Sequence, residues 1–251
     1  MDNELYEFVK ACGFKRFPHE ACGLIYSDRI GRPHYVECEN VSDEPEHRFL
    51  IAPEEMRKVE KMGKIVGCWH THCNEAPVAS PADKEACRNT DVPWLIGAVF
   101  KNDEGMKFSG LTVVEPDERY KTPLLGRSYV FGVFDCVSLM RDFYKQEFDI
   151  DLPEVPRYER MWEKEKDVMR RVAVDDLGFV RLKDDEPPQY GDVFLIQIGQ
   201  HGEDHIAIYI GDDKIMHQLR SRLSRVDVYG GSYWQERTLT RWRHKTKCSR
   251  K

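Results

Sequence analysis

The chain has 251 residues, of which 41% are hydrophobic and 33% charged, and its formal net charge is −6. This composition excludes a disordered polar chain, and the longest apolar run, at 92–100, is far shorter than the ~20 residues that a membrane-spanning helix needs. The length predicts one or two domains, each large enough for a hydrophobic core. The short apolar runs predict that the chain does not insert into a membrane.

The first residues, MDNELYEFVKACG, carry acidic side chains where an export signal would have a basic segment followed by a long apolar one. We therefore expect the chain to fold in the cytoplasm. In that compartment the eight cysteines are expected to be reduced thiols, metal ligands or a nucleophile rather than disulfides.

Residues 1–120 mix strand and helix patterns along the chain. Apolar segments predict strands at 21–27, 34–40, 48–53, 65–72, 94–100 and 108–116. Helical periodicity predicts helices at Asn3–Cys12, Pro53–Lys61 and Pro81–Asn89. Interleaved elements of this kind favour a mixed α/β domain.

A linker is predicted at 115–127, where EPDERYKTPLLGR combines two prolines, a glycine and dense charge. We place the boundary near 118–126, which gives domains at 1–120 and 121–251. In the second domain, helices are predicted at 136–147 and 158–175, followed by strands at 192–199, 204–211 and 214–219. Helices followed by clustered strands are typical of an α+β domain.

The last part of the chain, 214–251, is basic, since it holds 11 Lys and Arg residues but only two acids, Asp227 and Glu236. Such an excess favours contact with an anionic polymer or partner. A solvated basic tail is the alternative interpretation.

The first candidate site is built on His70 and His72. Residues two apart in a strand point to the same face, so both imidazoles can bind one ion. Asp83 supplies a third ligand, which leaves a fourth position for water, as in catalytic zinc sites. Attack on an amide also needs a general base and an oxyanion contact, for which Glu20 and Ser80 are available.

Two other interpretations fit parts of this pattern. Ser80 is also a good N-cap for a helix that begins at Pro81, with Asp83 as the acid in its first turn. The cap and ligand roles are compatible, because a cap needs only one oxygen of each side chain. Cys68 and Cys73 flank the histidines and offer a closed structural zinc site instead, although that site would leave Glu20 and Ser80 without a role.

Residues 3–114 resemble the JAMM (MPN+) zinc isopeptidases and metalloproteases, on the segments PHEACGLIYS and HTHCNEAPVASPAD. The resemblance implies a cytidine-deaminase-like mixed sheet with helices. It also implies that His70, His72 and Asp83 bind Zn²⁺, that Glu20 deprotonates the attacking water, and that Ser80 donates a hydrogen bond to the oxyanion.

The second candidate site contains a cysteine at a helix start. Cys136 follows Asp135, a good N-cap, and opens an apolar helical pattern. The positive end of a helix favours the thiolate, the form that attacks carbonyls. The alternative is a small buried residue that packs the first helical turn.

Two histidines lie downstream at strand ends, His205 in DHIAIYIG and His217 in KIMHQ. Alternation puts His205 and Ala207 on one face and the isoleucines on the core face. If Ile210 pairs with Lys214, Ala207 lies opposite His217 and the two imidazoles come within reach of each other. A two-residue turn would shift the register by one and direct His217 away.

These residues resemble the NlpC family of papain-like cell-wall peptidases. The matching landmarks follow in order: Tyr129, Gly132, the pair Asp135-Cys136, the strand start Gly191-Asp192-Val193, the segment from His205 to Gly211, and His217. The resemblance implies Cys136 as nucleophile, His205 as base, His217 as its orienting group, and Tyr129 as a substrate or oxyanion contact. In the family the Asp-Cys pair is usually followed by Ser-Gly, whereas here it is followed by Val-Ser. His201 is a nearby alternative to His205 as the base.

The combination of both domains resembles the tail tip assembly proteins of lambda-like phages over nearly the whole chain. This implies action in tail assembly with other phage tail proteins, including one with a ubiquitin-like domain as the target of the zinc site. Peptidoglycan peptides are the implied substrates of the thiol site. Nucleic acid is not among the implied partners. The implied locations are the host cytoplasm during assembly and the virion tail tip. An assembly chaperone or structural tail component with inactive sites is the alternative.

Overall fold

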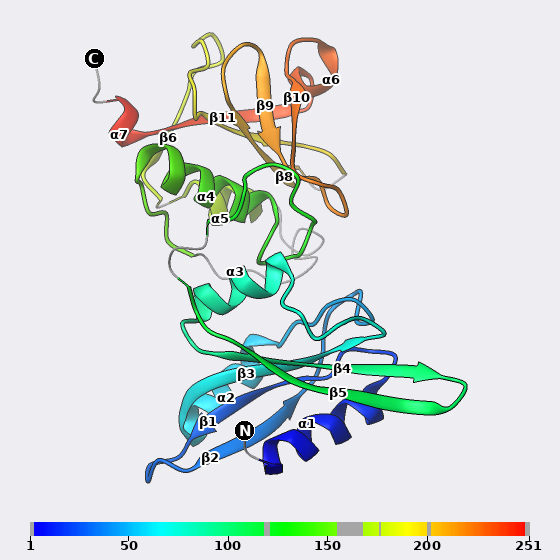
Figure 1. The fold of residues 1–251 in the computed structure, drawn as a ribbon. Coiled ribbons are helices and arrows are strands. Elements are labelled where there is room, and N and C mark those ends of the chain that lie inside the picture. The colour runs from blue at the N-terminus through cyan, green and yellow to red at the C-terminus, as the bar shows by residue number, and fades with distance from the viewer. Residues whose placement is uncertain (1–2, 118–120, 155–167, 176, 200–201, 249–251) are drawn as a thin grey trace. The chain divides into compact units, whose positions relative to one another are not determined.

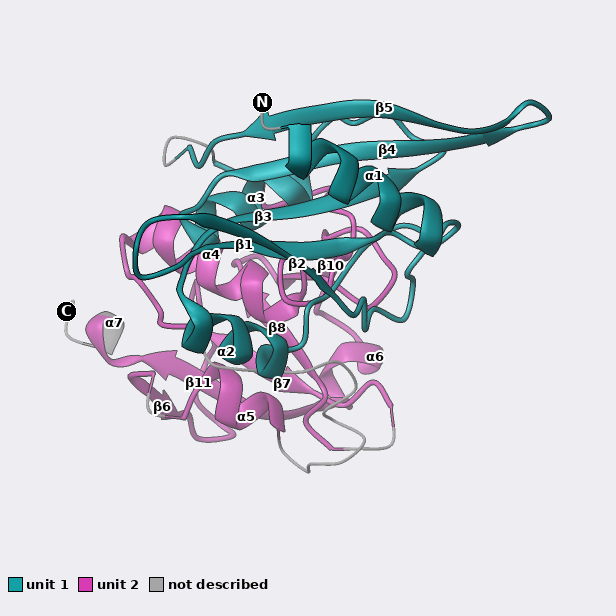
Figure 2. Cartoon of the chain, turned by 90° about the horizontal axis from the view of Figure 1, so that it is seen from below, with its two compact units in different colours: residues 1–122 teal, residues 123–251 magenta. Residues whose placement is uncertain are grey.

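The computed structural model describes residues 3–117, 121–154, 168–175, 177–199 and 202–248. The chain divides into two compact units, Met1–Thr122 and Pro123–Lys251 (Figure 2). In the described residues no helix is both long and apolar enough to cross a bilayer.

Unit 1 is built around a mixed five-stranded sheet (Figure 1). Its strands are β1 (Cys22–Ser27), β2 (Pro33–Cys38), β3 (Lys64–Cys73), β4 (Trp94–Asn102) and β5 (Gly105–Val114), in the spatial order β2-β1-β3-β4-β5. The β3–β4 pair is parallel and the other pairs are antiparallel. This confirms the mixed α/β fold that the sequence predicts.

Helices cover both faces of this sheet. Val9 and Cys12 of α1 (Asn3–Arg16) pack with Trp69 on one face. Val59 of α2 (Pro53–Met62) and Cys87 of α3 (Pro81–Thr90) pack on the other. The second face is the one that carries the two histidines of β3, because Cys22 of the same apolar cluster is paired directly with His70.

The strand expected at 48–53 does not form. Ile51 makes a single bridge with Asn40, and α2 already begins at Pro53. The Asn40 side chain accepts a hydrogen bond from the Leu50 N–H and donates one to the Arg48 carbonyl. A side chain thus binds the polar backbone groups that a neighbouring strand would otherwise satisfy.

Unit 2 begins with two helices, α4 (Cys136–Phe148) and α5 (Val168–Ala173). The predicted charged helix at 158–175 is helical at 168–173, and its first ten residues lie outside the described residues. A six-stranded antiparallel sheet follows, with spatial order β10-β9-β8-β7-β11-β6. Its strands are β6 (Phe179–Arg181), β7 (Val193–Ile196), β8 (His205–Tyr209), β9 (Lys214–His217), β10 (Arg225–Val228) and β11 (Thr238–His244).

Both faces of the second sheet are buried. Helices α4 and α5 pack against Ile206 and Ile208 of β8, so the isoleucines lie in the core as predicted. Ala207 and Tyr209 form a second apolar cluster with Trp234 of the short helix α6 (Ser232–Gln235). The antiparallel sheet and its helices confirm the α+β prediction.

The described part of the basic C-terminal stretch, 214–248, contributes β9, β10 and β11 to this sheet, so this part is not a solvated tail. Arg243 of β11 is buried and pairs with Asp192 and Glu186, at 2.8 and 2.6 Å. Arg241 donates to the backbone carbonyls of Lys183, Asp184 and Glu186. The last helix, α7 (Lys245–Cys248), follows directly after β11. Several of the positive charges therefore hold unit 2 together.

Candidate functional sites

His70 and His72 converge on one point at the end of β3. Their Nε2 atoms lie 3.1 Å apart, because alternate residues of a strand point to the same face. Across from them, Asp83 places Oδ1 3.5 Å from His70 Nε2 and Oδ2 3.6 Å from His72 Nε2. Of the potential ligand groups that the structure describes, these three lie within 4.8 Å of one another, and neither Cys68 nor Cys73 belongs to the cluster.

A capping box fixes Asp83 in this position. Ser80 Oγ accepts a hydrogen bond from the Asp83 N–H at 3.1 Å, and Asp83 Oδ2 accepts one from the Ser80 N–H at 2.8 Å. Pro81 begins the helix, as its missing N–H and fixed φ favour. The predicted cap therefore coexists with an Asp83 carboxylate that faces the histidines.

The surroundings of each histidine restrict its orientation. His72 Nδ1 lies 2.8 Å from the Ala76 carbonyl oxygen, which can only accept, so Nδ1 carries a proton. Burial opposes protonation of this ring, but its hydrogen bonds to Asp83 and to the Ala76 carbonyl raise the pKa of His72 to about 9, so its Nε2 also carries a proton, which a bound metal ion would replace. The His70 ring stacks on Phe49 with centroids 4.7 Å apart and meets the edge of Trp94 at 5.8 Å. Both imidazoles are thus held with Nε2 directed at Asp83.

Glu20 reaches the same cluster from the segment before β1. Cys22 is paired with His70 in the antiparallel β1–β3 ladder, and continuing this register places Glu20 opposite His72. Glu20 is buried, with only 5% of the residue exposed. This burial raises the pKa of Glu20 to about 8, although the charge on His72 opposes the rise.

The electrostatics of the cluster suit a cation. Burial lowers the pKa of His70 to about 4, despite the opposing charge of Asp83, which keeps this imidazole neutral. Burial would raise the pKa of Asp83, but His70 and hydrogen bonds from His72 and Ser80 outweigh it and lower the pKa to about 2. Two imidazole nitrogens and one carboxylate oxygen are a ligand set found in catalytic zinc sites, so the residues present fit Zn²⁺.

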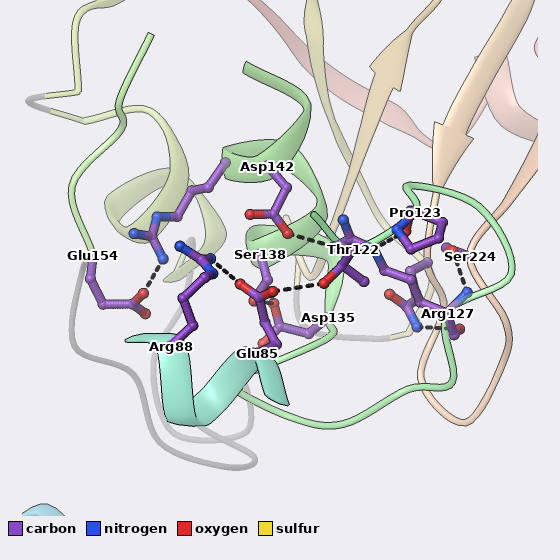
Figure 3. A network of polar contacts seen from close by, with 12 residues as sticks. Glu85, Arg88, Thr122, Pro123, Arg127, Asp135, Ser138, Asp142, Glu154 and Ser224 are labelled. Atoms are coloured by element: carbon purple, nitrogen blue, oxygen red, sulfur yellow. Dashed lines mark hydrogen bonds and ion pairs between the residues drawn. The ribbon is translucent and has the colours of Figure 1, made fainter. Parts of the chain in front are cut away.

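In unit 2, Cys136 is the first residue of α4. Asp135 is its N-cap, as predicted, and Oδ1 accepts from the Ser138 N–H at 2.8 Å (Figure 3). Asp135 Oδ2 accepts from the Gly132 N–H at 2.8 Å, and Gly132 has a φ of +79°, which favours glycine. Cys136 is 9% exposed and belongs to the same core cluster as Ile206, the residue that follows His205.

The half-buried Tyr129 lies just before this turn, two residues after Arg127. Figure 3 shows the side-chain contacts of Arg127 that anchor this segment. The Arg127 side chain donates to Asp142 Oδ2 of α4 and to the Pro123 carbonyl, each at 2.6 Å. Its backbone N–H donates to Ser224 Oγ at 3.0 Å. These contacts tie the approach to Cys136 to the body of unit 2.

His205 and His217 lie on neighbouring strands in the first of the two predicted registers. Ala207 is paired with His217, and the Ile210 N–H donates to the Lys214 carbonyl at 3.0 Å. As a result, His205 Nε2 lies 3.0 Å from His217 Nδ1. His201, the competitor for the base, lies outside the described residues.

The contact continues past His217 to a residue that the sequence analysis gave no role. His217 Nε2 lies 3.1 Å from Asp227 Oδ2, and Arg225 Nη2 donates to the same oxygen at 2.8 Å. Trp234 also contacts the His217 ring in an edge-to-face arrangement, with centroids 4.7 Å apart. The signal in the sequence was that Asp227 is one of only two acids in the basic stretch 214–251.

Both imidazoles of this pair are kept neutral. Burial lowers the pKa of His205 well below its usual value, and protonation of the neighbouring His217 would lower it further. Burial also lowers the pKa of His217, although Asp227 partly offsets the effect. A neutral histidine has one nitrogen that donates a hydrogen bond and one that accepts. The two rings can therefore form a chain of hydrogen bonds in which every bond has the same direction.

Two protein families match separate parts of the chain. Residues 5–109 match the prokaryotic homologs of the JAB domain, and residues 126–243 match the NlpC/P60 family. Both domain resemblances drawn from the sequence are confirmed by these matches.

Two curated proteins match most of the chain, and both are called tail tip assembly protein K. The protein of Escherichia phage N15 is 31% identical over 247 residues, covering 98% of this chain and 96% of that protein. The protein of Escherichia phage lambda is 30% identical over 199 residues, covering 78% and 89%.

A solved NlpC/P60 family protein from Bacillus cereus ATCC 10987 is 12% identical, with a TM-score of 0.34. The match covers 96% of this chain and 66% of the Bacillus cereus chain. That score is too low to relate the arrangement of the two whole chains.

Proposed function

The chain belongs to the family of tail tip assembly protein K, and from this premise we propose that it carries two peptidase sites, one zinc-dependent and one thiol-dependent. The first is the JAB-like site of His70, His72 and Asp83. The second is the NlpC/P60-type site of Cys136, His205 and His217. Its partners are other phage tail proteins, met in the host cytoplasm during assembly, and it acts at the virion tail tip.

The zinc site is supported by the convergence of three ligand atoms within 4.8 Å. Bound zinc would lower the pKa of a water molecule and polarise the scissile carbonyl. Glu20 opposite His72 accepts the proton of the attacking water and later gives it to the leaving amine. Burial alone raises the pKa of Glu20 to about 8, and the positive charge of bound zinc would lower it towards neutral pH, where the carboxylate can accept this proton.

Ser80 is the proposed oxyanion contact. Its Oγ accepts from the Asp83 N–H, which uses a lone pair and leaves the hydroxyl proton to be donated. This hydrogen bond is stronger to the developing oxyanion than to the ground-state carbonyl, and the difference lowers the activation barrier. The proposed substrate is a tail protein with a ubiquitin-like domain.

The thiol site is supported by the 3.0 Å contact between His205 and His217. We place the Cys136 thiol beside His205. The imidazole takes the S–H proton while sulfur bonds to the peptide carbonyl carbon, and the carbonyl electron pair moves to oxygen. The C–N bond then breaks as His205 protonates the amine, and water hydrolyses the thioester to restore the thiol.

Tyr129 is proposed to contact the substrate or its oxyanion from the loop before Cys136. The substrate class is the peptide part of peptidoglycan. The alternative role, a chaperone-like or structural tail component, requires that one or both sites are inactive.

A cleavage assay tests the thiol site. Purified full-length protein is incubated with muropeptides, and the products are identified by mass spectrometry. We expect cleavage by the wild type and none by Cys136→Ala. Equal activity in both proteins, or none in either, would count against a thiol peptidase.

Alkylation tests the pairing of Cys136 with His205 independently of the substrate. Iodoacetamide should modify Cys136 faster in the wild type than in His205→Gln, because the imidazole promotes the thiolate. Cys73, which is half-buried in unit 1, serves as the internal reference thiol. Equal alkylation rates of Cys136 in the two proteins would contradict the pairing.

Metal analysis tests the first site. Protein purified without chelators should contain about one zinc per chain, as an intact three-ligand site predicts. A content below about 0.1 equivalent would count against the zinc assignment.

A further inference from the structure

The proton positions along His205, His217 and Asp227 follow from one fixed point. A carboxylate has no proton to donate, so Asp227 Oδ2, at 3.1 Å, accepts from His217 Nε2–H. Neutral His217 then has its lone pair on Nδ1. That nitrogen accepts from His205 Nε2–H at 3.0 Å, which leaves the lone pair of neutral His205 on Nδ1.

The opposite arrangement would disable the base. If His217 carried its proton on Nδ1, it would donate to His205 Nε2. Neutral His205 would then hold its own proton on Nδ1, and neither nitrogen would be available to take a proton from a thiol. The two arrangements differ only in proton positions, so an acceptor at the far end of the relay selects between them.

We propose that Asp227 is a positioning residue of the thiol site, which fixes the tautomer of His217 and through it the tautomer of His205. This assignment rests on the proposed thiol peptidase, because it concerns which nitrogen of the base receives the proton. Asp227 acts through His217, its contact at 3.1 Å.

The sheet holds Asp227 where this role requires it. Strand β10 pairs with β9 so that Arg225 lies opposite His217, and Asp227 is two residues further on the same face. Arg225 donates to Asp227 Oδ2 at 2.8 Å, and this ion pair holds the carboxylate beside His217. The groups that face His217 are thus His205 from β8, Asp227 and Arg225 from β10, and Trp234 from α6.

Nitrogen-15 NMR of the full chain tests the assignment without an activity assay. Histidine nitrogens with and without a proton have well-separated shifts, and His205→Gln and His217→Gln identify the two rings. We expect the Nε2–H form for both histidines in the wild type. Asp227→Ala should move His217, and with it His205, to a mixture of tautomers.

Kinetics on muropeptides supply the second readout. Asp227→Ala should lower kcat by roughly tenfold or more with little change in KM, because the base is mispositioned while the substrate contacts remain. Asp227→Asn is the second variant in case the alanine protein does not fold. Its amide oxygen can still accept, so it should retain more of the Nε2–H form and more activity than the alanine variant.

The matched control is Asp212→Asn in the β8–β9 turn. Asp212 is exposed and has a φ of +49°, a conformation that asparagine tolerates. This control should leave both tautomers and kcat unchanged.

Unchanged tautomers in both Asp227 variants would overturn the assignment, even if activity fell. If the wild type cleaves no muropeptide but the tautomers respond as expected, the proposed function fails, while the control of the two tautomers by Asp227 is confirmed.

Discussion

Each unit contains a pair of buried histidines next to an aspartate, but the two pairs are arranged differently. In unit 1, His70 and His72 come from one strand, and both direct Nε2 towards Asp83. In unit 2, His205 and His217 come from neighbouring strands and lie in series, with Nε2 of the first on Nδ1 of the second and Asp227 at the end.

This difference in geometry separates two kinds of chemistry. Lone pairs that converge on one point at 3–4 Å repel each other unless a proton or a metal ion lies between them, so the first arrangement suits a metal. A series of donors and acceptors instead gives each proton one position and one direction of transfer, which suits general base catalysis. The spacing along the chain decides which one forms, since residues two apart in one strand converge whereas residues on paired strands line up.

Removal of the nucleophile should give the largest effect. Cys136→Ala is expected to lower the rate of muropeptide cleavage by at least ~10³-fold, because no other group can form the thioester. Zinc content should not change. Cys73→Ala is the matched control, and a similar loss of cleavage in that variant would contradict the assignment of Cys136.

Glu20→Gln should separate metal binding from catalysis in unit 1. The amide cannot accept a proton from water, so hydrolysis of a tail-protein substrate should fall by about 10²- to 10⁴-fold. Zinc content, measured by atomic emission, should stay at the wild-type value, because Glu20 is not a ligand. Asp83→Asn should lose both the bound zinc and the hydrolysis. Loss of zinc in the Glu20 variant would show that Glu20 binds the metal instead.

Zinc removal should affect one unit only. An ion that binds the native state alone adds about 2.7 kcal/mol when present at 100 times its Kd. Hydrogen exchange should therefore become faster in β3 after chelation, and exchange in β8 should stay the same. Equal changes in both strands would mean that the metal stabilises both units.

Acid should weaken unit 2 through its histidines. Their pKa values in the folded chain are below the unfolded value of about 6.5, so the unfolded state binds more protons as the pH falls. The free energy of unfolding should be constant above pH 6.5 and decrease below it, by at most ~1.4 kcal/mol per pH unit for each histidine. Urea unfolding of unit 2 measures this slope, and His205→Gln should make it shallower. An unchanged slope in that variant would refute the burial of a neutral His205.

Loss of the cap should give the smallest effect. Ser80→Ala removes the acceptor for the Asp83 N–H and should cost about 1 kcal/mol of stability. It should also slow hydrolysis at the zinc site, since the proposed oxyanion donor is lost. Ser80→Thr keeps a hydroxyl and should retain most of both. Full activity in the alanine variant would leave Ser80 with the cap alone.

Local patterns in the sequence predicted the elements around both sites. The i, i+2 spacing of His70 and His72, the cap at Ser80-Pro81-Asp83 and the β8–β9 register all follow from short-range geometry. The strand expected at 48–53 failed because the Asn40 side chain, eight or more residues away, binds its backbone groups. A side chain that replaces a neighbouring strand leaves no periodicity in the sequence.

Asp227 was missed for a similar reason. Its contact with His217 depends on β10 pairing with β9, and β10 is a short strand of mixed polar and apolar residues, RVDV. β11 was also not predicted, because its arginines suggested a solvated surface, whereas Arg243 is buried against Asp192. Charges that are paired over long distances in the chain cannot be told from exposed ones by composition.

The contrast between convergent and serial histidine pairs is tested most directly by zinc content in matched variants. His70→Ala and His205→Ala each remove one buried histidine, and both are purified without chelators beside the wild type. We predict about one zinc per chain in the wild type and in His205→Ala, and less than about 0.1 in His70→Ala. Equal zinc in the two variants, or a loss confined to His205→Ala, would contradict the account.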